Sequence, residues 1–279
     1  MNPRHRHTKH LTLGFLTLGA QAAPLEVIGA AVDTGFRAVG LRISGRLPGD
    51  AWPAVDMDPA AFRKIRAAAA EHAVRISSVA GYYITPQTRI GHLLANVHAA
   101  RELGAPLIAQ GCFDADHAQV ATLLRDYAQA ANEAGVRIAL EFMPMSELKN
   151  IAQTLAVIER SGASNVGLLI DSLHLARAGD GAAEVLALDP RSIYLTQLCD
   201  APANLAPGNS LFEEAMSGRL YLGHGGLDLA ALVNALPAGA EIELETPVTA
   251  HAALEPAQRA RHAGAAATRF FDRHFAAPA

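Results

Sequence analysis

Four polar residues each close a short apolar run in the second half of the chain: Glu141, Asp171, Gln197 and Glu245. Each run has about the length of one buried strand, and a helix-like stretch separates it from the next. In a closed parallel barrel the C-terminal ends of all strands meet at one rim, so we expect these side chains to converge. Three carboxylates and an amide in a partly apolar cavity would repel one another without a cation. The pattern therefore predicts one divalent metal ion held by all four residues.

Such an ion would leave open positions for the carbonyl and the adjacent hydroxyl of a small-molecule substrate. It would polarise the carbonyl, acidify the neighbouring C–H bond and stabilise the resulting enediolate. One catalytic glutamate, Glu141 or Glu245, would remove the proton and the other would return one. If a β-hydroxyl leaves instead, the same site performs a dehydration, so the residues alone leave isomerisation and elimination both open.

Three further residues extend this predicted site. The segment Asp171-Ser-Leu-His174 places a histidine three residues after a strand-end aspartate, which favours a functional His174 over an ordinary loop histidine. Arg42 ends another predicted strand, where it could bind a substrate carboxylate or hydroxyl or form a salt bridge at the rim. Glu243 shares a strand face with Glu245 but must lie deeper in the barrel, and its role stays open.

Several residues have two possible roles. Asp200 is predicted to bond loop amides after the seventh strand, and His224 is predicted to face the pocket. Aromatic side chains near the rim could wall the pocket or simply fill the core: Phe15, Trp52, Tyr82, Tyr83 and Phe142.

The elements that must position these residues alternate between short apolar runs and longer amphipathic stretches, which is typical of parallel strands joined by helices. Eight strands are predicted, over residues 11–18, 38–42, 74–79, 106–109, 137–141, 166–171, 193–197 and 241–245. The clearest helices are predicted over residues 24–34, 59–72, 88–103, 116–134 and 256–274. The 279-residue chain is thus predicted to be an α/β protein with one (β/α)8 TIM-barrel domain over residues 11–279.

Two segments outside this alternation are informative. Residues 1–10 form a basic, histidine-rich tail, and residues 4–22 together imitate a secretory signal. We favour a strand over residues 11–18, because its removal would leave seven strands and an open barrel edge. The longest irregular segment, residues 201–226, has the length of a functional lid.

Composition limits the partners of the chain. A net charge of −4 argues against a nucleic-acid ligand, and the chain has no apolar run long enough to span a membrane. Cys112 and Cys199 are the only cysteines, which suggests a reducing compartment, and we expect a cytoplasmic protein. Exposed helices and the long segment 201–226 are compatible with a homo-oligomer.

The chain resembles the xylose-isomerase-like barrels of sugar isomerases, epimerases and related lyases, from residue 11 to about residue 275. Five motifs carry the resemblance: Leu140-Glu-Phe-Met-Pro144, Leu169-Ile-Asp-Ser-Leu-His174, Gln197-Leu-Cys-Asp-Ala-Pro202, Arg219-Leu-Tyr-Leu-Gly-His-Gly225 and Leu244-Glu-Thr-Pro247.

The resemblance implies a role for each matched residue. Glu141 and Glu245 are similar to the paired carboxylates that bind metal and flank the substrate. Asp171 is similar to a pure metal ligand. His174 is similar to the histidine that orients the substrate, and Arg219 to the residue that holds a substrate oxygen.

Gln197 departs from the histidine that isomerases and epimerases usually have as the fourth ligand. An amide oxygen is a harder ligand than imidazole, so it favours Mg²⁺ or Mn²⁺ over Zn²⁺ or Co²⁺. In having glutamine at this position, the chain also resembles the 3-dehydroshikimate dehydratases of the same superfamily. The resemblance thus implies a metal-dependent isomerase or epimerase of a small polyhydroxylated carbonyl compound, of the sugar or cyclitol type. The alternative is a metal-dependent dehydratase, a lyase of the 3-dehydroshikimate or inosose type.

Two other functions fit less well. The abasic-site nucleases on this barrel use a metal cluster with many histidines, and His174 is the only histidine here at a matching place. A non-catalytic ligand-binding barrel would not need the paired acids Glu141 and Glu245.

Overall fold

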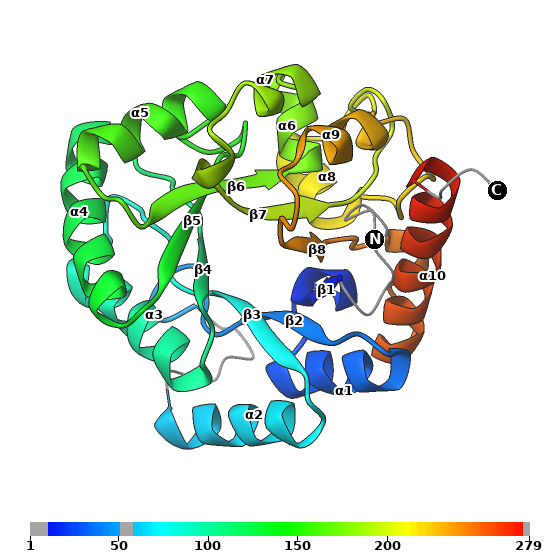
Figure 1. The fold of residues 1–279 in the computed structure, drawn as a ribbon, viewed down its shortest axis with the longest axis horizontal. Coiled ribbons are helices and arrows are strands. Elements are labelled where there is room, and N and C mark those ends of the chain that lie inside the picture. Colours follow the sequence, from blue (N-terminus) through cyan, green and yellow to red (C-terminus); the bar gives the residue numbers. More distant parts are fainter. Residues whose placement is uncertain (1–10, 51–57, 276–279) are drawn as a thin grey trace.

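The computed structural model describes residues 11–50 and 58–275, which form a closed barrel of eight parallel strands in the order β1 to β8 (Figure 1). This confirms the predicted single-domain TIM barrel. The histidine-rich segment 1–10 and Trp52 lie outside the described residues. The strands are β1 (Thr12–Gly14), β2 (Ala38–Arg42), β3 (Arg75–Ala80), β4 (Leu107–Gln110), β5 (Arg137–Glu141), β6 (Val166–Asp171), β7 (Ile193–Leu198) and β8 (Ile242–Leu244).

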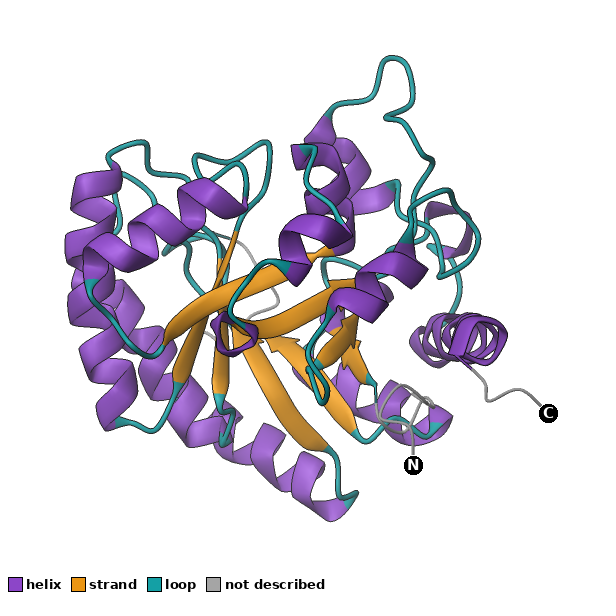
Figure 2. Ribbon diagram, turned by 45° about the horizontal axis from the view of Figure 1, so that its top comes forward, coloured by secondary structure: helices purple, strands orange, loops and turns teal. Residues whose placement is uncertain are grey.

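Helices surround the barrel on the outside (Figure 2). They are α1 (Pro24–Thr34), α2 (Pro59–Glu71), α3 (Ile90–Leu103), α4 (His117–Glu133), α5 (Ile151–Ser161), α6 (Ser172–Ala178), α7 (Ala182–Leu186), α8 (Leu211–Ser217), α9 (Leu229–Ala235) and α10 (Pro256–Phe275). In the described part of the chain, no helix combines the length and the apolar character needed to cross a membrane.

Local signals explain most boundaries. Asp58 accepts a hydrogen bond from the backbone N–H of Ala60 at 2.9 Å, and Pro59 occupies the first turn of α2. Gly104 ends α3 in the left-handed conformation with φ 71°. These predicted boundaries are confirmed to within two residues.

The first strand is shorter than predicted. Only Thr12–Gly14 pairs as β1, and Phe15–Leu18 forms a 3₁₀ helix instead of continuing the strand. Thr17 explains the turn, because its hydroxyl donates to the carbonyl of Leu244 at 2.7 Å and accepts from the backbone N–H of Thr246 at 2.9 Å. The chain therefore folds across the end of β8 and carries Phe15 to the rim.

Side chains alternate between the two faces of each strand. Along β5, Ile138 and Leu140 pack into the large apolar layer between strands and helices. Ala139 instead belongs to a small apolar cluster with Leu107, Leu169 and Leu195. Glu141 has the same facing as Ala139, so the strand aims it at the rim above this apolar layer.

Both cysteine side chains are completely buried and free. Burial raises the pKa of Cys112 to about 11 and that of Cys199 to about 12. Because thiolates are the reactive form, we expect neither thiol of the native protein to react with Ellman's reagent at pH 8. Two thiols should react after denaturation. A native thiol that reacts within minutes would contradict this burial.

Candidate active site

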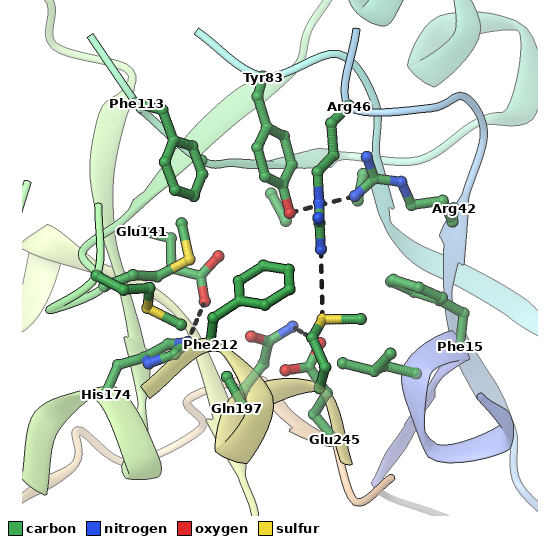
Figure 3. A pocket seen from close by; sticks show the side chains of 18 of the residues that line it. Phe15, Arg42, Arg46, Tyr83, Phe113, Glu141, His174, Gln197, Phe212 and Glu245 are labelled. Atoms are coloured by element: carbon green, nitrogen blue, oxygen red, sulfur yellow. Dashed lines mark hydrogen bonds and ion pairs between the residues drawn. The ribbon is translucent and has the colours of Figure 1, made fainter. Parts of the chain in front are cut away.

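A cavity opens at the C-terminal rim of the barrel. Three of the four predicted strand-end residues line it, namely Glu141, Gln197 and Glu245, and Figure 3 shows them facing a common space. Asp171 is fully buried behind this lining. The structure thus brings the predicted rim residues together, as the strand ends indicated.

Asp171 organises the start of α6. Its Oδ1 accepts hydrogen bonds from the backbone N–H groups of Leu173 at 2.8 Å and His174 at 3.0 Å, so the strand-end aspartate is also the N-cap of the helix. Its Oδ2 accepts from Nη1 of Arg219 at 2.5 Å. Asp171 therefore fixes His174 on one side and Arg219 on the other.

His174 lies against Glu141. Its Nε2 is 3.6 Å from Oε1 of Glu141, and its side chain is 4% exposed. Burial lowers the pKa of His174 to about 4, so the imidazole is neutral near pH 7. A neutral imidazole can donate a hydrogen bond to a substrate oxygen or bind a metal ion.

Arg219 lies between the acids of β6 and of the end of β8. Besides Asp171, its guanidinium contacts Oε2 of Glu245 through Nη2 at 3.1 Å, and its Nε donates to the carbonyl of Ala215 at 2.8 Å. The side chain is 2% exposed. The role implied by the resemblance, holding a substrate oxygen, stays a prediction.

Gln197 is oriented by two acids. Its Nε2 donates to Oε1 of Glu243 at 2.8 Å and to Oε1 of Glu245 at 3.2 Å. Since the amide nitrogen points at these carboxylates, the amide oxygen must point away from them. That orientation leaves the oxygen available as an acceptor or a metal ligand.

Glu243, whose role the sequence left open, lies below the cavity. It is 2% exposed and accepts from Ser78 Oγ at 2.9 Å in addition to Gln197. Burial raises the pKa of Glu243 to about 7. Glycine at position 40 provides the space, because a Cβ there would lie 2.0 Å from Oε2 of Glu243. Glu243 thus supports the rim from beneath.

The three rim acids differ in their protonation. Burial raises the pKa of Glu141 well above its ordinary value, and the charges of Glu245 and Asp171 raise it further. Burial also raises the pKa of Glu245 to about 8, although Arg219 opposes this shift. Burial acts in the same direction on Asp171, but Arg219 and His174 outweigh it, so the pKa of Asp171 is lowered. Asp171 is therefore the ionised member, and full ionisation of the others requires more positive charge.

Donor atoms for a metal ion lie close together at the centre of this site. Glu141, Asp171 and His174 each bring one ligand atom to within 4.8 Å of the other two. Two carboxylates and a neutral imidazole form a suitable donor set for a divalent cation. The predicted four-residue set shares Glu141 and Asp171 with this group, and metal binding by Gln197 and Glu245 stays a prediction.

The remaining wall of the cavity is cationic and aromatic. Arg42 is 3% exposed and donates to the carbonyl of Ser44 at 2.8 Å and to the hydroxyl of Tyr83 at 3.3 Å. The guanidinium of Arg46 lies 5.1 Å from the ring centre of Phe212. The rings of Tyr83 and Phe113 stack at 5.6 Å.

The sequence identified only part of this wall. Of the aromatic residues for which the sequence left both roles open, Phe15 and Tyr83 line the cavity, whereas Phe142 is fully buried in the core and Tyr82 packs against His92. Residues from loops and from α8 were missed: Arg46, Phe113, Met143, Met145, Phe212 and Met216. For those on α8, the one available signal was the length of segment 201–226.

Two predictions for the loop after β7 have opposite outcomes. Asp200 accepts from the backbone N–H groups of Gly223 at 3.0 Å and Gly225 at 2.8 Å, which confirms its structural role. His224 was predicted to face the pocket, and this is wrong. Its side chain is exposed, outside the cavity lining, with its ring edge-on to Tyr221. The Asp200 contacts hold this loop in a turn that leaves His224 on the outside.

A family model described as the xylose isomerase-like TIM barrel matches residues 28–267. The chain belongs to this family. Inosose isomerases from Halalkalibacterium halodurans and Bacillus velezensis are 26% and 30% identical to it, over 41% and 42% of its length. These matches span only 39% and 40% of the two relatives.

Solved structures agree with the family fold. The IolI protein with a bound zinc atom has a TM-score of 0.79 at 16% identity, covering 96% of this barrel and all of that chain. An L-ribulose 3-epimerase has a TM-score of 0.69 at 18% identity, covering 95% of both chains. The probable 3-DHS dehydratase AsbF from Bacillus anthracis has a TM-score of 0.69 at 12% identity, covering 92% of this chain and 98% of its own. At these identities the likeness shows the fold alone.

Proposed function

We propose that this protein is a metal-dependent isomerase or epimerase of a small polyhydroxylated carbonyl compound of the sugar or cyclitol type. The observation that carries the proposal is the approach of two largely buried glutamates, Glu141 from β5 and Glu245 after β8, to one cavity. The partial similarity to inosose isomerases supports the substrate class.

The two glutamates suit proton transfer at carbon. A carboxyl whose pKa is raised toward neutrality is a stronger base when ionised and a usable acid when protonated. Burial raises the pKa of both Glu141 and Glu245. One of them would remove a proton from the carbon next to the carbonyl, and the other would return a proton to the neighbouring carbon or to the opposite face.

The other residues would position the substrate. Asp171 fixes the first turn of α6 and thereby aims His174 into the cavity. The neutral imidazole of His174 would donate a hydrogen bond to a substrate oxygen. The sulfur and aromatic side chains of Met145, Phe212 and Met216 would exclude water from the reacting carbons.

Glu141 and Asp171 would hold the metal ion, with the amide oxygen of Gln197 and the carboxylate of Glu245 as further ligands and His174 beside them. When bound, a divalent ion would supply positive charge that polarises the substrate carbonyl. A set rich in oxygen donors favours Mg²⁺ or Mn²⁺. We expect about one divalent ion per chain by elemental analysis after mild dialysis, as for a single-ion site. Finding none, together with activity that chelators leave unchanged, would end the metal proposal.

One observation favours a second candidate reaction. The cationic wall formed by Arg42 and Arg46, beside the stacked rings of Tyr83 and Phe113, suits a ring that carries a carboxylate. A cyclic keto-acid bound there would present its β-hydroxyl to the same glutamates. The site would then act as a dehydratase of the 3-dehydroshikimate type.

Substrate trials in D₂O distinguish the two reactions. We expect an inosose or a ketose to be recovered with deuterium on the carbon next to the carbonyl, without new ultraviolet absorbance. A conjugated product formed from 3-dehydroshikimate would favour the dehydratase instead. Absence of exchange and of elimination across inososes, ketoses and cyclic keto-acids, with Mn²⁺ present, would contradict both.

A further inference from the structure

Arg219 is paired with two residues that we assign as ligands of the metal ion. Nη1 donates to Oδ2 of Asp171 at 2.5 Å, and Nη2 lies 3.1 Å from Oε2 of Glu245. The same guanidinium lies 3.3 Å from the sulfur of Cys199. The guanidinium lines the cavity, but these contacts hold it against the barrel rim.

This pairing divides the acids of the site. Asp171 uses Oδ1 for the first turn of α6 and Oδ2 for Arg219, so each of its oxygens already has a donor. Oε1 of Glu245 accepts from Gln197, and Oε2 faces Arg219. Glu141, by contrast, has His174 as its close polar neighbour. Arg219 therefore places its single positive charge between the two acids that β6 and the end of β8 contribute.

A divalent ion that binds the same carboxylate oxygens would approach the guanidinium closely. Two cations so near each other repel strongly in a site with little water. The conflict concerns the two oxygens that Arg219 holds, Oδ2 of Asp171 and Oε2 of Glu245, where the guanidinium and the ion would exclude each other. The remaining acid, Glu141, would still be stabilised by the added positive charge.

We propose that Arg219 is an exchangeable internal counter-ion, whose guanidinium and a divalent cation compete for Asp171 and Glu245. The proposal rests on the metal dependence proposed above. Binding of the ion would displace Arg219 from both carboxylates. It would also break the hydrogen bond from Nε of Arg219 to the carbonyl of Ala215, which lies on α8.

Through the loss of that hydrogen bond, binding of the ion would affect helix α8. Helix α8 carries Phe212, Ala215 and Met216, all of which line the cavity. Phe212 is 43% exposed, so its end of the helix is open to solvent. The exchange at Arg219 would therefore loosen α8 when the site is loaded with metal.

Mn²⁺ binding to the purified protein tests the competition. Free Mn²⁺ gives an electron paramagnetic resonance signal that bound Mn²⁺ largely loses, so the dissociation constant can be measured without turnover. We expect Arg219→Gln to bind Mn²⁺ at least about tenfold more tightly than the wild type, a typical strength for coupled binding. Arg46→Gln is the matched control, because it removes one positive charge from the same cavity and Arg46 donates to Met216 rather than to these acids.

Each result decides the matter. Tighter binding by Arg219→Gln, with little change in Arg46→Gln, supports the competition. Equal tightening in both variants indicates a general charge effect and overturns it. Unchanged binding in Arg219→Gln beside a wild type that binds Mn²⁺ overturns the competition alone. Absence of Mn²⁺ binding in every variant also removes the metal from the proposed function.

A crystal of the wild type grown with Mn²⁺ keeps the proposal testable if Arg219→Gln does not fold. We expect the ion to contact Asp171 and Glu245, with the guanidinium of Arg219 moved away from both. An ion held at the site while Arg219 still contacts the two carboxylates would overturn the proposal.

Discussion

Replacing Glu245 with glutamine is expected to lower kcat by about 10²- to 10⁴-fold, the usual contribution of a general acid or base. Glutamine keeps the shape of the side chain and an oxygen that accepts from Gln197, but it cannot carry a proton to or from carbon. The fold should survive, because burial raises the pKa of Glu245 to about 8 and so already disfavours its charge. Asp171 also remains paired with Arg219.

Glu241→Gln is the matched control for this experiment. Glu241 lies on the same segment, but at the opposite end of the barrel, where it forms a salt bridge with the half-exposed Arg75. Such a pair contributes about 0–1 kcal/mol, so we expect normal kcat and nearly normal stability. Steady-state kinetics and circular dichroism on both variants check the prediction. Activity of Glu245→Gln close to that of the wild type would remove Glu245 from the mechanism.

The centre of the site was predictable because it depends on strand geometry. Alternation of side chains and the common direction of parallel strands are enough to bring Glu141, Gln197 and Glu245 to one rim. The same reasoning placed Glu243 deeper, and the structure shows it bonded to Gln197. Strand ends are therefore the part of such a barrel that a single sequence indicates best.

The surroundings of the centre were not predictable by this route. Arg46 lies in a loop, where no periodicity fixes the direction of a side chain, and Phe212 lies on α8, a short helix within a segment that was predicted to be irregular. The pairing of Arg219 depends on a chain reversal after α8, where Asp200 pairs with Leu220 and Gly218 with Val248. Contacts of this kind depend on the whole loop, so the motif around Arg219 identified the residue but not its partners.

Asp200→Ala is expected to destabilise the protein by about 1–3 kcal/mol, the cost of leaving a buried donor without a partner. Two of the four N–H groups that it would release belong to the exposed residues Gly223 and Gly225, so they can bond to water instead. The carboxylate is 2% exposed and accepts four backbone N–H groups. These groups belong to Ala201, Gly223, Gly225 and Leu227, at distances from 2.8 to 3.1 Å. Asp200→Asn should lose less stability than Asp200→Ala, because its side-chain oxygen still accepts hydrogen bonds. It should be less stable than the wild type, because its amide nitrogen is a donor that faces other donors. Urea unfolding of the three proteins measures the order.

The consequence of Asp200→Ala should reach the site as well as the fold. The backbone of Asp200 pairs with that of Leu220, the neighbour of Arg219. The carboxylate of Asp200 therefore anchors the loop that positions the backbone of Arg219. We therefore expect faster proteolysis within residues 201–226. We also expect the Arg219→Gln substitution to change the dissociation constant for Mn²⁺ less in the Asp200→Ala variant than in the wild type. If Asp200→Ala unfolds like the wild type and resists protease equally, the loop is held by other contacts. Arg219 would then owe its position to its own salt bridges with Asp171 and Glu245, and the competition with metal would be independent of the loop.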